Sequence, residues 1–185
     1  MELLQEFITL LSGRFDNRAQ IQEFSRQGIS DFPYAQHVNT ICNDKITGLP
    51  AGFSGFFLVE ESYYTVKGRT NASPHLFLFT QEGNQVQLTS YELPEGADKT
   101  SFTYETMQPV PYAHLKPSPK FTPARYEKRG DFWEGGSEST FAPGLIFKLY
   151  ERFSPQVLEV SESMERGGVR IFGYDRPICY RRSQP

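Results

Sequence analysis

The chain is poor in the residues that build the commonest metal, nucleotide and hydrolase sites. Its 185 residues include two cysteines, three histidines and one tryptophan. Cys42 and Cys179 stand far apart and form no CxxC pair or Cys/His ligand spacing, so a structural zinc site is not expected. The sequence also contains no P-loop, no dinucleotide fingerprint and no Gly-x-Ser-x-Gly elbow. The sequence motifs therefore identify no catalytic residue.

Long apolar runs and an excess of one charge are missing too. No apolar run approaches the length of a membrane span, and the first six residues lack the basic and apolar parts of a signal peptide. Lys and Arg number 19 against 22 Asp and Glu, which gives a net charge of −3. Because phosphate binding needs a concentrated positive field, we expect no nucleic-acid partner. We expect a cytoplasmic protein with reduced thiols and no membrane partner.

Aromatic and turn-forming residues, by contrast, are abundant. The chain has 16 Phe and 10 Tyr, together with 15 Gly and 13 Pro. Bulky rings suit a pleated, half-buried surface, and Gly and Pro supply the turns that many short strands need. The length fits one domain with a substantial core. We therefore predict a single, mostly β domain over residues 1–185.

The first 24 residues are predicted to be helical. Leu3, Leu4, Phe7, Leu10 and Leu11 fall on one face of a helix over 3–11, which should end at Gly13. A second short helix should begin at Asp16 or Asn17 and reach about Phe24. We expect this pair to cover one mouth of the β structure or to pack on its outside.

Strand-like runs separated by turn signals follow from residue 34 to residue 182. This series predicts one antiparallel barrel of the calycin or lipocalin-like type, and small barrels bind molecules in their interior. The first and last strands of a closed barrel can be neighbours, so Cys42 and Cys179 could lie close together. An exposed edge strand could mediate a homodimer, but no run identifies it. The predicted strands are 34–43, 53–66, 75–80, 85–93, 101–107, 124–128, 131–134, 140–153 with a break at Pro143-Gly144, 156–164, 169–174 and 178–182.

Residues 108–123 contain five prolines and are predicted to form a long extended loop. The loop could be a lid or a strap across the barrel. It could also dock a partner protein through its extended backbone, which requires a segment that is free of the barrel.

Two adjacent glutamates, Glu60 and Glu61, lie in a strongly predicted strand. Successive strand side chains point to opposite faces, so the two cannot form a carboxylate dyad. Tyr63 and Phe57 share a face with Glu61. If Glu61 faces the interior it needs a partner, for which Arg125 and Arg170 are candidates; alternatively, one glutamate lies at the solvated rim.

The three histidines and the tryptophan complete the set of candidate site residues. His37, His75 and His114 are scattered without ligand spacing, so no metal site is expected. His37 could equally be a hydrogen-bonded core residue. Trp133 lies close to Gly135-Gly136 and could stack on a planar ligand or pack in the core.

The leading hypothesis is a barrel that binds a small, partly apolar molecule, because aromatic-lined concave sites with a few polar groups are the usual form of a ligand pocket. We expect binding rather than catalysis, and no cofactor. The predicted lining residues are His37, Phe57, Glu61, Tyr63, His75, Tyr91, Arg125 and Trp133.

Three runs in the first half resemble the T-type phycobiliprotein chromophore lyases, which are lipocalin-like barrels. Residues 11–20, with Gly13, Phe15, Asn17 and Gln20, are similar to the helical opening of that family. Residues 57–63 resemble a family strand with an aromatic run, a glutamate and then a tyrosine. Residues 33–37 are similar to its first strand with a one-residue gap. The resemblance covers about residues 10–93.

The resemblance implies a helical cap on an antiparallel barrel. Its second implication is an alternative function, a lyase-like protein that carries a tetrapyrrole and presents it to a partner. The departures concern the family's functional residues. Where the family has paired arginines after Pro-Tyr, this chain has Pro74-His75-Leu76-Phe77. The family's C-terminal Asp-Arg-Gly run and Trp-Gly pair have no counterpart, and the nearest fragment is Gly173–Pro177.

Overall fold

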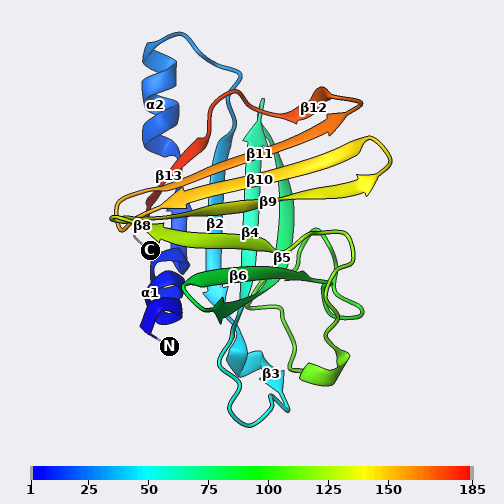
Figure 1. Ribbon diagram of the computed structural model, residues 1–185. Helices are drawn as coiled ribbons and strands as arrows, with labels where there is room; N and C mark the ends of the chain where they lie inside the picture. The colour runs from blue at the N-terminus through cyan, green and yellow to red at the C-terminus, as the bar shows by residue number, and fades with distance from the viewer. Residues whose placement is uncertain (1, 184–185) are drawn as a thin grey trace.

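The computed structural model describes residues 2–183 and consists of two helices and a set of antiparallel strands (Figure 1). The helices are α1 (Glu2–Leu11) and α2 (Arg18–Arg26), as the sequence predicts. The strands of the main sheet are β1 (Gly13–Asp16), β2 (Tyr34–Ile41), β4 (Phe56–Val66), β5 (Arg69–Glu82), β6 (Gln85–Tyr91), β8 (Ala124–Arg129), β9 (Phe132–Ala142), β10 (Leu145–Phe153), β11 (Leu158–Arg166), β12 (Val169–Gly173) and β13 (Ile178–Arg182).

The main sheet closes on itself. Its order is β10-β9-β8-β6-β5-β4-β2-β1-β13-β11, and β11 pairs with β10, so that ten of the strands described within residues 2–183 form a ring. Strand β12 pairs with β11 outside this ring and exposes Val169, Ile171 and Phe172. The predicted fold class is confirmed: the chain is a closed antiparallel barrel with N-terminal helices, consistent with a calycin or lipocalin-like barrel.

The ring is closed by β1, which the sequence did not predict. This four-residue strand lies between the two helices and pairs with both β2 and β13. Gly13 adopts a φ of +124°, and a Cβ there would collide with the Arg182 guanidinium. That guanidinium donates hydrogen bonds of 2.6 and 2.8 Å to the carbonyl oxygens of Ser12 and Leu10. The positive φ therefore favours glycine at position 13, and the missing Cβ leaves space for the guanidinium.

Because β1 separates β2 from β13, the two cysteines are not neighbours. In the strand register, Cys42 lies beyond the Gly13 end of β1 and Cys179 beyond the Asp16 end. Both are free thiols, and the sequence-based suggestion that they could lie close together is wrong.

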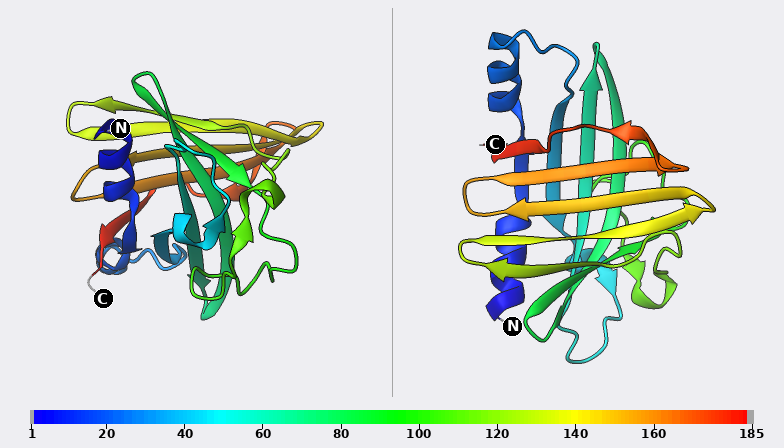
Figure 2. Two further views of the ribbon diagram at one scale, coloured as in Figure 1. Left: turned by 90° about the horizontal axis from the view of Figure 1, so that it is seen from below. Right: turned by 45° about the horizontal axis from the view of Figure 1, so that its top comes forward.

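Helix α1 covers one end of the barrel (Figure 2). Its apolar face carries Leu4, Phe7, Ile8 and Leu11, all buried in the core cluster that also contains Trp133. Phe7 is completely buried, and its ring centroid lies 5.0 Å from that of Trp133 and 5.0 Å from that of Phe153. This end of the barrel is thus a packed aromatic core rather than an opening.

Helix α2 is attached to the outside of the barrel near β13. The buried side chain of Asn17 fixes its start, because Asn17 Nδ2 donates to the Pro33 carbonyl (2.9 Å) and Asn17 Oδ1 accepts from the Ala35 amide (2.8 Å). Phe24 then packs against Phe32. Within the described part of the chain no helix has both the length and the apolar character required to cross a bilayer.

A strap made of residues 93–118 covers the outer face of β4, β5 and β6. Phe102, Met107, Val110 and Leu115 are buried there against Phe57, Val59 and Leu76 in a second core cluster. Two short strands, β3 (Ile46–Thr47) and β7 (Val110–Pro111), pair in parallel within this layer. The predicted strand at 101–107 is wrong, since this part of the strap consists of turns.

Much of the proline-rich segment belongs to the strap and is held against the barrel. The amide of Glu92 donates to the Lys116 carbonyl (2.9 Å) and the amide of Ser118 to the Ser90 carbonyl (2.8 Å). The segment is not free of the barrel, which removes the premise of the partner-docking hypothesis.

Candidate functional site

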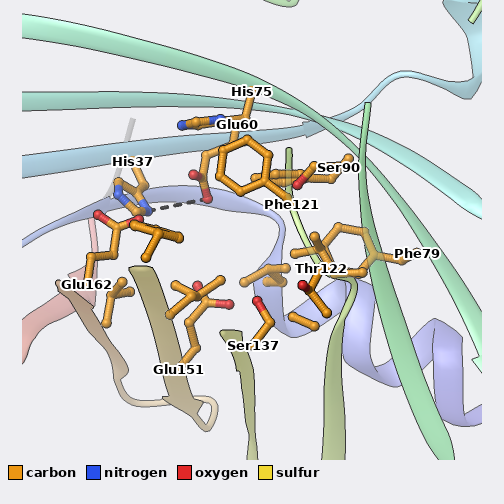
Figure 3. Close-up of a pocket in the computed structure, with 17 residues that line it drawn as sticks. His37, Glu60, His75, Phe79, Ser90, Phe121, Thr122, Ser137, Glu151 and Glu162 are labelled. Atoms are coloured by element: carbon orange, nitrogen blue, oxygen red, sulfur yellow. Dashed lines mark ion pairs between the residues drawn. The ribbon is translucent and has the colours of Figure 1, made fainter. Parts of the chain in front are cut away.

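A cavity of about 50 Å³ lies inside the barrel, beyond the end that α1 covers. Figure 3 shows His37, Glu60 and Glu162 on one side of it and Phe79 on the other. Its polar lining includes His37, Glu60, His75, Glu151 and Glu162, and its apolar lining includes Leu11, Phe77, Phe79, Leu88, Phe121 and Leu149.

The alternation of side chains along β4 places Glu60 in the interior and Glu61 outside. Leu58 belongs to the barrel core together with Phe79, and Glu60, two residues further, lines the cavity. The neighbours Phe57 and Val59 face outward but are equally buried, because the strap covers them. Both faces of β4 therefore exclude water, and only one of them borders the cavity.

The cavity contains three glutamates from three strands, and burial is the main cause of the raised pKa of each. The Glu60 side chain is 13% exposed, and burial raises its pKa to about 7. Burial raises the pKa of Glu151 to about 8 and that of Glu162 to about 7, and in both cases repulsion from Glu60 adds to the effect. Near neutral pH these carboxyls therefore hold protons that ordinary glutamates lose.

Each carboxyl accepts one hydrogen bond from a neighbouring hydroxyl. Ser62 donates to Glu60 at 3.1 Å, and Tyr64 donates to Glu162 at 3.3 Å. The buried Tyr126 hydroxyl donates to Glu151. These bonds position the three carboxyl groups, but none of the donors carries a positive charge.

His37 joins the cluster from β2 with only 3% of its side chain exposed. Its Nε2 lies 3.0 Å from the Tyr180 hydroxyl and 3.4 Å from the Tyr64 hydroxyl. Its Nδ1 lies 3.6 Å from Glu60 Oε2 and has no hydrogen-bond partner. Burial lowers the pKa of His37 to about 3, so the ring is neutral and its approach to Glu60 is a polar contact rather than an ion pair.

His75 lines the cavity from β5. Its ring lies parallel to that of Phe77, with centroids 5.4 Å apart, and its Nε2 is 3.2 Å from the Ser73 hydroxyl. Burial, with smaller contributions from His37 and Lys120, lowers the pKa of His75 to about 4. Both cavity histidines are therefore neutral at physiological pH.

A compensating cation is missing from the lining. Neither lysine nor arginine occurs among the described residues that border the cavity. Lys120 lies outside it, with Nζ 4.4 Å from the ring centroid of Phe141. Within residues 2–183 no group of His, Cys, Asp and Glu side chains is arranged to hold a metal ion. The cavity thus combines three ionisable carboxyl groups with mostly apolar walls, and its described lining contains no cation.

Of the eight residues predicted to line the pocket, the structure places two, His37 and His75, in the cavity. Phe57 and Tyr91 pack against each other under the strap, with ring centroids 5.2 Å apart. On the same outer face the Tyr63 hydroxyl donates to Glu61 at 2.9 Å.

The other two predicted residues also lie elsewhere. Arg125 points to solvent, with 61% of its side chain exposed, and pairs with Glu82 at 3.7 Å. Trp133 is fully buried in the aromatic core below α1. Sequence reasoning missed Glu60 as the inward residue, and it missed Glu151 and Glu162.

Comparisons of the chain with protein-family models, with curated proteins and with solved structures gave no significant match. The geometry of the cavity is therefore the basis for assigning a function.

Proposed function

We propose that the protein binds a small molecule inside the barrel, in the cavity bordered by Glu60, Glu151, Glu162 and His37. The observation that carries this proposal is the carboxyl cluster, which lies in an aromatic cavity with no neighbouring cation among the lining residues. Aromatic walls with a few convergent polar groups of shifted pKa are typical of ligand sites.

The energetics support the same function. Burying a carboxyl group without a cationic partner destabilises a fold, and apolar side chains of similar size would pack the barrel at lower cost. The α1 end of this barrel is packed in that way, around Phe7 and Trp133. A ligand that uses the carboxyl groups accounts for their presence in the cavity that adjoins this core.

Filling the cavity should abolish binding. Ser137 lines the cavity from β9. Replacing it by leucine adds apolar volume inside, whereas Thr140→Leu, further along the same strand, places the same leucine side chain at an exposed position. In native mass spectrometry of protein purified from its own cells, we expect a non-covalently bound species with the wild type and with Thr140→Leu, and none with Ser137→Leu. A wild type without a bound species, or a species that Ser137→Leu retains, would contradict the proposal.

A second candidate is carriage of a tetrapyrrole. Two residues of the runs that resemble the chromophore lyases, His37 and Glu60, border the cavity. Buried carboxyl oxygens are suitable acceptors for pyrrole N–H groups. A tetrapyrrole is larger than a cavity of about 50 Å³, so its binding requires the cavity to widen, which displacement of the partly buried Phe121 ring would begin.

Addition of a bilin tests this candidate. Carriage predicts a shifted visible absorbance band that weakens in Glu60→Gln and persists in Glu61→Gln, its outward neighbour. An unshifted spectrum, or equal spectra of the two variants, excludes tetrapyrrole binding at this site.

A further inference from the structure

The ionisable lining of the cavity contains acidic groups but, within residues 2–183, no lysine or arginine. Three carboxyl groups from β4, β10 and β11 converge on it, and repulsion between them contributes to their titration. The other titratable groups that face or adjoin them are neutral at physiological pH, and the positive charge of Lys120 acts on the cavity residue His75. These neutral groups are His37 on β2, His75 on β5, Tyr64 on β4, Tyr126 on β8 and Tyr180 on β13.

The cluster also has unused hydrogen-bonding capacity. The bonds to Glu151 and Glu162 each involve one carboxyl oxygen, Oε2, and the second oxygen accepts none from the residues described. His37 Nδ1, on an almost fully buried ring, has no hydrogen-bond partner. Buried polar atoms are normally paired, so His37 Nδ1 has room for a ligand partner, and the second oxygens of Glu151 and Glu162 are free to accept hydrogen bonds from the same ligand.

The remaining wall of the cavity is mostly apolar, with Ser90, Thr122 and Ser137 as its polar members. Phe77, Phe79, Leu88 and Leu149 line it. Phe121 forms an edge contact with Phe141 (5.2 Å between centroids) and a second with Phe147 (5.9 Å). A complementary ligand therefore has a charged or proton-donating end and a compact apolar body.

We propose that the ligand is a small organic cation, a protonated amine with a compact apolar or aromatic body, whose ammonium group binds between Glu60, Glu151 and Glu162. This inference rests on the proposed function and specifies its ligand class. An ammonium group supplies donors to the free carboxyl oxygens and the positive charge that the cavity lacks. It binds the ionised carboxyl, so each carboxyl that it engages releases its proton to solvent.

The size of the cavity limits the body of the amine. A cavity of about 150 Å³ accommodates benzene, and this one measures about 50 Å³. An aromatic amine therefore displaces the ring of Phe121, a lining residue that is only partly buried. Phe121→Ala removes that ring, so its cavity should accept benzylamine more readily than that of the wild type.

Calorimetric titration with three matched probes tests the ligand class: benzylamine (cationic), benzyl alcohol (neutral) and benzoate (anionic). For the wild type and Phe121→Ala we expect benzylamine to bind most tightly and benzoate least. Because the carboxyls must ionise, benzylamine affinity should rise at least about tenfold from pH 6 to pH 8.5, whereas that of benzyl alcohol stays constant. Buffers of different ionisation enthalpy should reveal proton release with the amine alone.

Isosteric variants locate the site. Glu60→Gln, Glu151→Gln and Glu162→Gln should each weaken benzylamine binding and reduce proton release, while Glu61→Gln on the outer face of β4 should leave both unchanged. Equal effects of Glu60→Gln and Glu61→Gln would overturn the assignment.

The probes also separate the two proposals. If benzyl alcohol binds as tightly as benzylamine at both pH values, the barrel binds small molecules but the cation assignment is wrong. If none of the three probes binds to the wild type or to Phe121→Ala, the small-molecule function fails as well.

Discussion

Phe7→Ala is expected to lower the free energy of unfolding by about 3–5 kcal/mol, the usual range for removing a buried phenylalanine ring. Phe7 has no exposed surface and anchors α1 in the end of the barrel. Its ring makes edge or tilted contacts with four aromatic rings at centroid distances of 5.0–5.4 Å: Phe79, Tyr126, Trp133 and Phe153. These rings come from four strands, so the cavity left by the substitution cannot collapse without moving the sheet.

Urea unfolding followed by Trp133 fluorescence measures this loss. Gln5→Ala, on the exposed face of α1, is the matched control and should change stability by less than about 0.5 kcal/mol. If Phe7→Ala and Gln5→Ala have equal effects, α1 does not close the barrel by packing.

The sequence predicted the two helices and most strands because their apolar periodicity is regular. Strand β1 escaped prediction because Gly13–Asp16 has only four residues and no alternation to detect. Its strand conformation is imposed from outside, by pairing with β2 and β13. Such tertiary pairing between distant segments cannot be read from a short local sequence.

The strap explains why the wrong glutamate was favoured. Alternation showed that Glu60 and Glu61 face opposite ways, and the apolar companions of Glu61, Phe57 and Val59, made its face resemble the interior. These companions are buried by residues 93–118 rather than by the barrel core. A strand that is buried on both faces carries no sequence signal that tells inside from outside.

The sequence around Glu151 and Glu162 contains a pattern that could have predicted their burial. Each stands in an otherwise apolar alternating series: Leu149, Glu151 and Phe153 on β10, and Leu158, Val160 and Glu162 on β11. A carboxyl among apolar residues on one face of a strand indicates a buried acid, which is rare without a functional reason. Their convergence on Glu60 depends on barrel closure and could not be predicted.

The free energy of unfolding is expected to fall by about 3 kcal/mol between pH 6.5 and pH 8.5, given about 1.4 kcal/mol per pKa unit. The three cavity carboxyls keep their protons in the folded state up to pKa values of about 7, 8 and 7, against an ordinary value of 4.5. In this range the unfolded chain has already lost those protons. Rising pH therefore favours the unfolded state until the folded carboxyls ionise, and stability then levels off.

The histidines act in the opposite direction and at lower pH. The pKa values of His37 and His75 are lowered from 6.5 to about 3 and about 4, so the unfolded chain binds protons that the folded protein does not. Their contribution is lost as pH falls through about 6.5 and is nearly constant above about pH 7.5, so it does not produce a decline at higher pH. The decline above pH 6.5 is therefore attributed to the carboxyls, whereas the two effects oppose each other between about pH 4.5 and 6.5.

Urea unfolding at a series of pH values, compared between Glu151→Gln and Glu61→Gln, assigns the decline to the cavity. Glutamine keeps an oxygen that can accept the Tyr126 hydrogen bond but does not titrate, so Glu151→Gln should remove about 2 kcal/mol of the loss above pH 6.5. Glu61→Gln should retain the wild-type decline, because Glu61 lies on the outer face of β4. If the free energy of unfolding of the wild type does not change above pH 6.5, the carboxyls ionise freely in the folded protein. In that case burial does not hold their protons, and ligand binding at this site needs no proton release.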